Sequence, residues 1–249
     1  MEREAYQALR QLQDRHWWFR GRRKILGALI EQFLPRNSQR PDILEAGCGY
    51  GGNLGALAKF GSVYGFELDD DAREYAIATV GANLGAPVAF GVLPDEPGFA
   101  ESRFDLIVML DVLEHIDDDI ASLARLRAML KPGGKILITV PALPWLWSKH
   151  DEIHHHKRRY SSRTLSDALR RAQLDPVKIG FFNSLLLPLA ILQRLGAKLL
   201  GREGRVDEIP PQSLNALLAW IFGLERKLVG KLPMPLGLSL FAVAGPANA

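Results

Sequence analysis

Apolar residues recur with two different periods along the chain. Short apolar runs alternate with longer segments in which apolar positions return every three or four residues, as on one face of a helix. The runs expected to form strands are 43–46, 62–68, 87–93, 104–110, 135–140, 177–182 and 238–244. The segments expected to form helices are 4–34, 54–60, 70–81, 118–130 and 164–172. This alternation predicts an α/β fold, a doubly wound, seven-stranded and mainly parallel sheet with helices on both faces.

Two segments depart from the alternation. Residues 1–40 form an N-terminal helical segment, and residues 183–237 form a helical insertion before the last strand that is too long for a hairpin loop. The insertion contains two apolar helical stretches, 185–200 and 214–228, which a polar segment joins. The expected limits are 1–249 for a single domain, 41–182 for its core and 238–249 for the last strand and tail.

Composition is that of an ordinary globular chain. Hydrophobic residues make up 47% and charged residues 24%, and the formal net charge is +3. Cys48 is the single cysteine, so no intrachain disulfide is possible and nothing indicates an oxidising compartment. The charged N-terminus lacks the apolar region of a signal peptide, and the longest uncharged apolar stretch, 179–193, is shorter than the ~20 residues of a spanning helix. We expect a cytoplasmic protein.

Basic residues occur in two clusters, at 20–24 and 157–159. Aromatic residues gather separately, at 17–19 and 145–147, and do not alternate with the basic residues as they do on a surface that stacks bases. We therefore expect no nucleic-acid partner.

A glycine-rich turn at residues 45–52 follows the first predicted strand and reads Glu-Ala-Gly-Cys-Gly-Tyr-Gly-Gly. Residues without a β-carbon permit a tight turn and let a ligand approach the backbone, and the helix that follows offers free N–H groups. Glu67 ends the second strand, which lies beside this turn in a doubly wound sheet. Its carboxylate can accept hydrogen bonds from both hydroxyls of a ribose, which predicts a nucleoside-containing cofactor.

The same turn is compatible with a dinucleotide. Gly47, Gly49 and Gly52 satisfy the spacing G-x-G-x-x-G, and Glu67 stands where the dinucleotide fingerprint has its acid. These residues alone leave an NAD(P)-binding oxidoreductase open, as well as a glycine turn that is purely structural.

Two further elements separate these alternatives. The fourth strand runs into Asp-Val-Leu-Glu-His at 111–115, and Lys-Pro-Gly-Gly at 131–134 precedes the fifth strand. Together with the glycine turn and Glu67, they resemble the class I S-adenosylmethionine-dependent methyltransferases. The resemblance covers residues 42–142 closely and extends loosely to the last strand, which is antiparallel in that family. It implies a Rossmann-like methyltransferase fold, an enzyme, and S-adenosylmethionine as cofactor.

The resemblance implies a role for each matching position. The implied cofactor-binding residues are Arg22, Glu45, Gly47, Cys48, Gly49, Glu67, Leu68, Leu110 and Asp111. In that family the turn faces the methionine part of the cofactor, Glu67 binds the ribose, Leu68 packs on the adenine, and residues 110–111 lie near the sulfonium. One departure is visible, because the Gly-Asp pair that often ends the third strand is Gly-Val here, at 91–92, and Asp95 is not expected in register.

The N-terminal segment adds a second resemblance. Residues 16–23 read His-Trp-Trp-Phe-Arg-Gly-Arg-Arg and are similar to a segment of ubiquinone-pathway O-methyltransferases in which an arginine meets the cofactor carboxylate. Arg22 matches best, because Ile25 and Leu26 follow on the same helix face, and a guanidinium suits a carboxylate. A surface arginine is the alternative.

Histidines cluster in segment 150–156, which follows the fifth strand and so lies at the ligand-binding edge of the sheet. Methyl transfer to an oxygen benefits from a general base, and histidine titrates near neutral pH. His150 and His154, with His115 after the fourth strand, are therefore the candidate catalytic residues. A zinc site at His150 and His154 is an alternative. Nearby prolines indicate a loop without a cysteine partner, so no metal is expected; a purely structural polar loop under the tryptophans at 145–147 also remains open.

The insertion should lie beside the acceptor, because the sixth strand is expected to end at the same edge as the others. Its apolar helices predict a lid for a lipid-linked acceptor or a peripheral membrane contact through 185–229, with packing on the sheet or a homodimer interface as alternatives. The predicted function is methyl transfer to an oxygen of a small or lipid-linked acceptor. An oxidoreductase, for which no Tyr-Lys pair is apparent, and a non-catalytic partner protein of the same fold are the alternatives.

Overall fold

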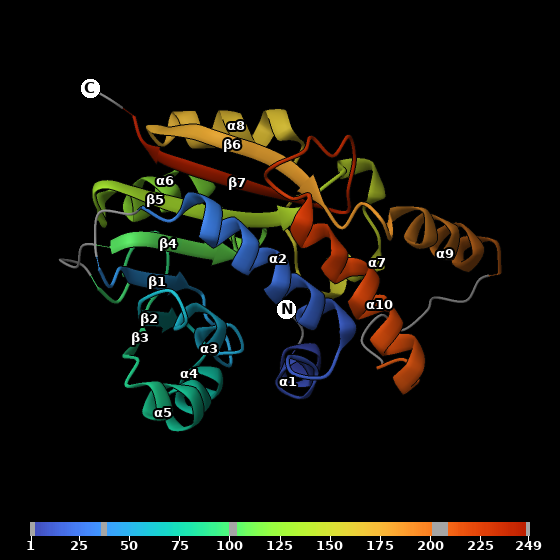
Figure 1. The fold of residues 1–249 in the computed structure, drawn as a ribbon, viewed down its shortest axis with the longest axis horizontal. Helices are drawn as coiled ribbons and strands as arrows, with labels where there is room; N and C mark the ends of the chain where they lie inside the picture. Colours follow the sequence, from blue (N-terminus) through green and yellow to red (C-terminus); the bar gives the residue numbers. More distant parts are fainter. Residues whose placement is uncertain (1–2, 36–38, 100–103, 201–208, 248–249) are drawn as a thin grey trace.

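The computed structural model describes residues 3–35, 39–99, 104–200 and 209–247. A seven-stranded sheet forms its centre, in the order β3-β2-β1-β4-β5-β7-β6 (Figure 1). The strands are β1 (Asp42–Ala46), β2 (Ser62–Glu67), β3 (Val88–Phe90), β4 (Phe104–Leu110), β5 (Leu130–Pro141), β6 (Leu174–Phe182) and β7 (Ser239–Pro246). Neighbours from β3 to β5 are parallel, and β7 lies antiparallel between β5 and β6. The predicted sheet is confirmed.

Helices cover both faces of this sheet (Figure 1). They are α1 (Arg3–Leu12), α2 (Trp17–Phe33), α3 (Leu54–Leu57), α4 (Asp70–Ala76), α5 (Ala82–Leu84), α6 (Asp119–Ala128), α7 (Lys149–Ile153), α8 (Ser162–Arg171), α9 (Leu187–Leu200) and α10 (Gln212–Leu224). Short 3₁₀ turns are found at Leu113–His115, Pro144–Leu146 and Glu225–Lys227. Over the described residues, no helix combines the length and the apolar character needed to cross a bilayer.

The protein has two hydrophobic cores, one on each face of the sheet, and β4 contributes buried side chains to both. Leu106, Val108 and Leu110 pack in the core beneath α2, whereas Ile107 and Met109 pack in the core beneath α6 and α8. A continuous apolar run is the pattern of a central parallel strand, because neither of its faces meets water. The predicted bounds of this strand, 104–110, agree with the structure.

The single helix predicted over 4–34 is two helices in the structure. The chain breaks at 13–16, where the backbone of His16 is extended and its ring accepts a hydrogen bond from the Trp18 N–H. An N-cap of this kind satisfies a donor that the helix itself leaves free. Helical periodicity continues through the break, so the pattern alone did not show it.

Other boundaries moved for local reasons. The predicted helix 70–81 is α4 followed by a π turn, Ile77–Gly81. β5 begins at Leu130, so the predicted turn at 131–134 lies inside a strand that pairs Leu130 with Phe104 across a register shift. A bulge of this kind absorbs the glycines without ending the pairing.

The second helix of the insertion packs on α2. Asn215 of α10 accepts a hydrogen bond from the Trp17 N–H at 2.8 Å, and Phe222 packs edge-on against the Trp17 ring. Glu225 accepts hydrogen bonds from three successive N–H groups, of Asn183 to Leu185, and so fixes the start of the insertion. α10 therefore packs against the rest of the domain, through α2.

Contact between α2 and α10 depends on a glycine. A Cβ on Gly21 would lie 2.5 Å from Cδ1 of the fully buried Phe222, whereas a Cβ on Gly27 would meet only Phe60, at 3.7 Å. We expect Gly21→Ala to lower the free energy of unfolding by about 1–2 kcal/mol through overpacking. Gly27→Ala, in the same helix, should raise it by up to about 1 kcal/mol through helix propensity. Denaturant titrations of both variants check this, and equal effects would contradict it.

Candidate active site

The glycine turn follows β1 at the edge where the parallel strands end. Gly47, Gly49 and Gly51 all have positive φ angles, of 72°, 54° and 80°. A Cβ on Gly47 would lie 2.8 Å from Cγ2 of Val112, in the turn that follows β4. Both the backbone conformation and the close approach therefore require glycine. The result is a half-buried stretch of backbone between the first two strands and β4.

Glu67 ends β2 beside this turn. Its carboxylate accepts hydrogen bonds from the N–H groups of Gly49, Leu68 and Asp69 at 2.8, 2.9 and 3.0 Å. Leu68 itself is 56% exposed and, with residues 69–71, lines an open cavity of about 430 Å³. A fixed carboxylate next to an exposed leucine is the arrangement predicted for a ribose and an adenine.

Tyr6 of α1 covers the same turn and was missed by sequence reasoning. Its phenol hydrogen-bonds Glu67, and burial together with the carboxylate charge raises the pKa of Tyr6. Its ring packs against Tyr50, with 5.5 Å between centroids. Gln13 reaches the turn as well, because a Cβ on Gly52 would lie 2.5 Å from its Oε1. The helical pattern of residues 4–34 could not show which face meets the edge of the sheet.

Glu45 lies beneath the turn. It is buried, Asn53 donates a hydrogen bond to its Oε1 at 2.8 Å, and its Oε2 has no partner among the described residues. Burial raises the pKa of Glu45 to about 7. The neighbouring thiol of Cys48 points away, into the core against Gly65, and burial also raises its pKa. Only the backbone of Cys48 can therefore face a ligand.

Arg22 reaches the end of β4 from α2. It forms an ion pair with Asp111, donates a hydrogen bond to Thr139 of β5 at 2.8 Å and lies over the ring of Trp18. Asp111 follows Leu110 directly and has a positive φ of 54°. The structure thus brings the predicted Arg22 and Asp111 together, with a buried guanidinium rather than a surface arginine.

Four histidines gather around Glu114, from the turn after β4 and from the segment after β5. The ring centroids of His150 and His154 are 4.1 Å apart, and those of His115 and His156 are 4.8 Å apart. Burial, with the neighbouring imidazoles, lowers the pKa of His115 and of His150 to about 3. Both rings are therefore neutral near neutral pH and bind a proton weakly.

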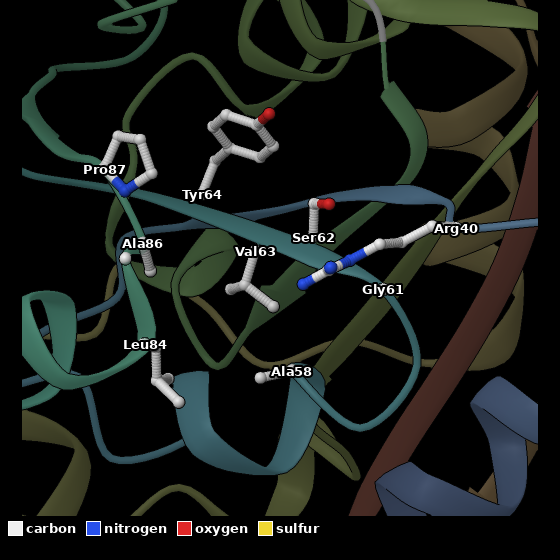
Figure 2. A pocket seen from close by; sticks show the side chains of 10 residues that line it. Arg40, Ala58, Gly61, Ser62, Val63, Tyr64, Leu84, Ala86 and Pro87 are labelled. Carbon is white, nitrogen blue, oxygen red and sulfur yellow. The ribbon is translucent and has the colours of Figure 1, made fainter.

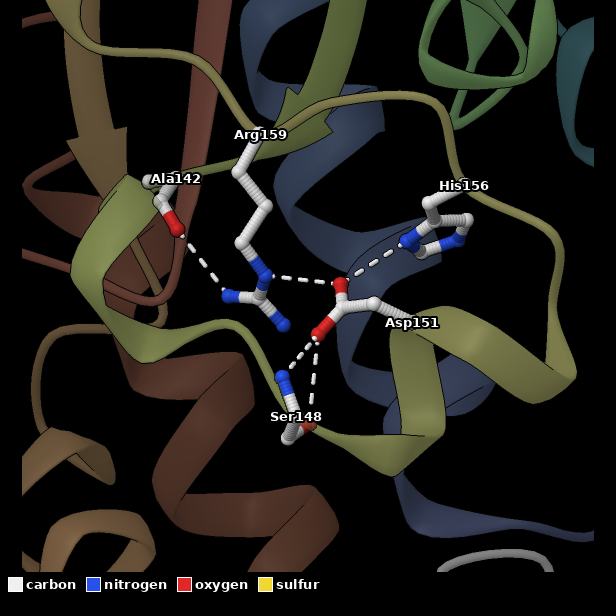
Figure 3. A network of polar contacts seen from close by, with 5 residues as sticks. All are labelled: Ala142, Ser148, Asp151, His156 and Arg159. Atoms are coloured by element: carbon white, nitrogen blue, oxygen red, sulfur yellow. Dashed lines mark hydrogen bonds and ion pairs between the residues drawn. The ribbon is translucent and has the colours of Figure 1, made fainter.

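The histidine segment is only in part the loop predicted from its prolines, since residues 154–159 are irregular but those before them are helical. Residues 149–153 form α7, because Ser148 and Asp151 make a capping box at its start. Asp151 also accepts hydrogen bonds from Arg159 at 2.7 Å and from the ring of His156 at 2.9 Å (Figure 3). Arg159 in turn donates to the carbonyl of Ala142 at 3.0 Å. These charges keep the pKa of Asp151 below its ordinary value despite burial.

Glu114 is another site residue to which the sequence analysis assigned no role. It is fully buried between the histidines and Asp111, and neither of its oxygens has a hydrogen-bond partner among the described residues. Burial, and next the charge of Asp111, raise its pKa well above the ordinary value. Its position in the sequence motif at 111–115 was the only available signal.

A second cavity, of about 270 Å³, lies at the other edge of the sheet (Figure 2). It is lined by Arg40, Gly61–Tyr64 and residues 84–87. Ser62 begins β2, whereas Glu67 ends it, so this cavity is separated from the glycine turn by the length of the strand. The functional groups described above do not reach it.

Glu45 gives the turn a measurable pH dependence. Since its folded pKa of about 7 exceeds the ordinary 4.5, the folded state holds the proton between these values. The contribution of Glu45 therefore favours folding at acid pH and is lost as pH rises through about 7. Relative to Glu45→Gln, we expect the wild type to lose up to about 3 kcal/mol of unfolding free energy from pH 5 to pH 8. Denaturant titrations check this, with exposed Glu31→Gln as control; parallel pH curves would contradict it.

The residues at this edge fit S-adenosylmethionine. The Oε2 of Glu45, which has no partner among the described residues, suits an ammonium group. A Cβ on Gly49 would meet only the Tyr6 hydroxyl, at 3.9 Å, so the backbone there can face the methionine chain. The Glu67 carboxylate suits the ribose hydroxyls. Leu68 offers an exposed apolar surface for the adenine. Asp95 is exposed on the loop that follows β3.

Known proteins similar to this chain are methyltransferases. A family model described as a methyltransferase domain matches residues 18–179. A ubiquinone biosynthesis O-methyltransferase from Cereibacter sphaeroides is 27% identical over 152 residues, which are 54% of this chain and 60% of that protein. One from Paramagnetospirillum magneticum is 32% identical over 106 residues, 42% of each chain. The alignments thus span less than two thirds of these relatives.

Solved structures show the same fold. A geranyl diphosphate methyltransferase in complex with S-adenosylmethionine superposes with a TM-score of 0.61 at 16% identity, over 90% of this chain and 85% of that one. An S-adenosylmethionine-dependent methyltransferase from Clostridium acetobutylicum gives a TM-score of 0.60 at 13% identity, over 90% and 92%. Since the family model matches more than half of its residues, the chain belongs to the class I S-adenosylmethionine-dependent methyltransferase family.

Proposed function

We propose that the protein transfers the methyl group of S-adenosylmethionine to an oxygen of a small or lipid-linked acceptor. One observation carries the proposal: the glycine turn with its bonded Glu67 ends at the same edge of the sheet as Asp111 and the histidine cluster. This supports a cofactor and an acceptor that bind at the same edge of the sheet. Such an arrangement suits a reaction that depends mainly on alignment and exclusion of water.

Each side of the site has a separate task. The cofactor supplies an electrophilic methyl group. Glu67 would hold its nucleoside, the turn would face its methionine chain, and Glu45 would hold its ammonium group. Arg22 is the candidate to bind the carboxylate of the cofactor. Because Arg22 already pairs with Asp111, one guanidinium would hold both carboxylates.

The histidine cluster is the candidate acceptor side. His115, His150 and His154 lie together, as a shared role in the reaction requires. The low pKa values of His115 and His150 favour neutral rings that orient an acceptor hydroxyl by hydrogen bonding over strong bases. The relatives named for O-methyl transfer favour an oxygen acceptor.

Cofactor binding tests the proposal directly. We expect Glu67→Ala to weaken the binding of S-adenosylmethionine by ~1–3 kcal/mol, because it removes charge-assisted hydrogen bonds to the ribose. Isothermal titration calorimetry measures this, with Glu31→Ala on the exposed face of α2 as the matched control. S-adenosylhomocysteine should bind as well. Binding of NAD without S-adenosylmethionine would contradict the proposal and support the oxidoreductase alternative.

The insertion supports the lipid-linked form of the acceptor. Leu189 and Leu192 of α9 and Leu217 and Trp220 of α10 are each at least half exposed. Exposed basic residues at 226–227 follow α10 directly. Exposed apolar side chains on two helices, with positive charges after the second helix, suit a membrane surface with anionic headgroups. We propose that these helices contact such a membrane peripherally and so bring the acceptor to the site.

A vesicle experiment tests this contact. The wild type should co-sediment with vesicles that contain anionic phospholipid, and the double variant Leu217→Gln, Trp220→Gln should bind them roughly tenfold more weakly, since it removes the apolar contact. Leu84→Gln, at an exposed leucine of α5, is the control. If the wild type stays in the supernatant and light scattering shows a dimer that the double variant dissociates, the surface is a homodimer interface instead.

A further inference from the structure

Three potential metal ligands converge beside the cofactor edge. Glu114 and His115 come from the turn after β4, and His156 comes from the segment after α7. One ligand atom from each lies within 4.8 Å of the other two. Three atoms so spaced lie no more than about 2.8 Å from a common centre, and metal–ligand bonds are about 2.0–2.2 Å long. A contraction of at most about 0.8 Å per residue would therefore place all three around one ion.

Glu114 points to a cation independently of this spacing. Its side chain is fully buried, and neither carboxylate oxygen has a hydrogen-bond partner among the described residues. A carboxylate without partners is costly to bury, and a bound cation would satisfy both oxygens. The backbone keeps it in place, because the Lys157 N–H donates to the Glu114 carbonyl at 2.7 Å and so ties the two segments together.

Both imidazoles are held as metal-binding histidines usually are. Nδ1 of His156 is engaged by Asp151 at 2.9 Å, which leaves Nε2 available (Figure 3). Asp151 is itself fixed by Arg159. The His115 ring donates to the backbone carbonyl of His155, so its second nitrogen is also available. A carboxylate or carbonyl behind each ring sets the tautomer and the direction of the ligand nitrogen.

Neighbouring charges come from several elements. Asp111 acts on Glu114 with negative charge, which favours a cation, whereas Arg22 and Arg159 act with positive charge. Each guanidinium is already paired, Arg22 with Asp111 and Arg159 with Asp151. The opposing charges are therefore largely neutralised before any ion binds.

We propose that Glu114, His115 and His156 bind one divalent transition-metal ion. Two imidazoles and one carboxylate suit Zn²⁺, Co²⁺ or Fe²⁺, whereas Mg²⁺ prefers an all-oxygen set. This departs from the expectation of no metal and from the alternative pair His150 and His154. Three protein ligands leave a position open. That this position would receive the acceptor oxygen, so that His115 acts on the acceptor through the ion, rests on the proposed function; the metal site itself does not.

Metal titration of the full chain tests the site. After removal of metal with a chelator, calorimetry with Zn²⁺ and the visible absorption of added Co²⁺ should show one ion per chain, and Mg²⁺ should bind far more weakly. Glu114→Gln and His156→Ala should each weaken Zn²⁺ binding by about 100-fold or more, and Asp151→Asn by about 10–100-fold through the orientation of His156. His155→Asn, at an exposed neighbour with positive φ, should leave it unchanged.

The outcomes are separable. Circular dichroism and S-adenosylmethionine calorimetry on the same samples report folding and the cofactor site, and near-isosteric Glu114→Gln guards against loss of the fold. Normal cofactor binding without Zn²⁺ binding would overturn the metal site alone. Zn²⁺ binding that survives His156→Ala but is lost in His150→Asn would place the ion elsewhere and overturn it as well. Failure to bind S-adenosylmethionine would instead overturn the proposed function.

Discussion

The turns that leave β1 and β4 can lie side by side only because Gly47 has no side chain. A Cβ there would lie 2.8 Å from Val112, so any other residue would push the two turns apart. This contact fixes the position of Asp111, whose φ is positive, at the start of the turn after β4. It thereby fixes where the Asp111 carboxylate pairs with Arg22. Glu114 follows one turn later. The cofactor side and the histidine side of the site are thus fixed by one close approach between adjacent parallel strands.

The sequence pattern predicted an element well when burial was uniform along it. β4 is apolar throughout, and its predicted limits agree with the structure. The pattern failed where a single polar contact decides the backbone. His16 ends the continuity between α1 and α2 by capping, and the capping box of Ser148 and Asp151 turns a predicted loop into α7. Such contacts leave no periodic trace, because they involve one side chain and one or two N–H groups.

The site divides in the same way. Gly47 and Glu67 were predictable because tight turns and strand ends impose residue types at fixed spacing. Tyr6 and Asp151 were not. Tyr6 reaches Glu67 from a helix 61 positions earlier, and Asp151 acts by holding Arg159 and His156 rather than by facing a ligand. Residues that act through others carry no signature of their own, so only the folded chain reveals them.

Charge explains why the fold tolerates such a polar edge. Four carboxylates and two guanidinium groups interact there: Glu45, Asp111, Glu114, Asp151, Arg22 and Arg159. The two arginines pair with the two aspartates, and each of the two glutamates is buried with at least one oxygen that has no partner in the described part of the chain. Burial raises both glutamate pKa values, so each costs stability when ionised. A cofactor with an ammonium group beside Glu45 and a divalent ion beside Glu114 would offset that cost, because each brings positive charge to a buried carboxylate. The edge is therefore better suited to the occupied protein than to the empty one.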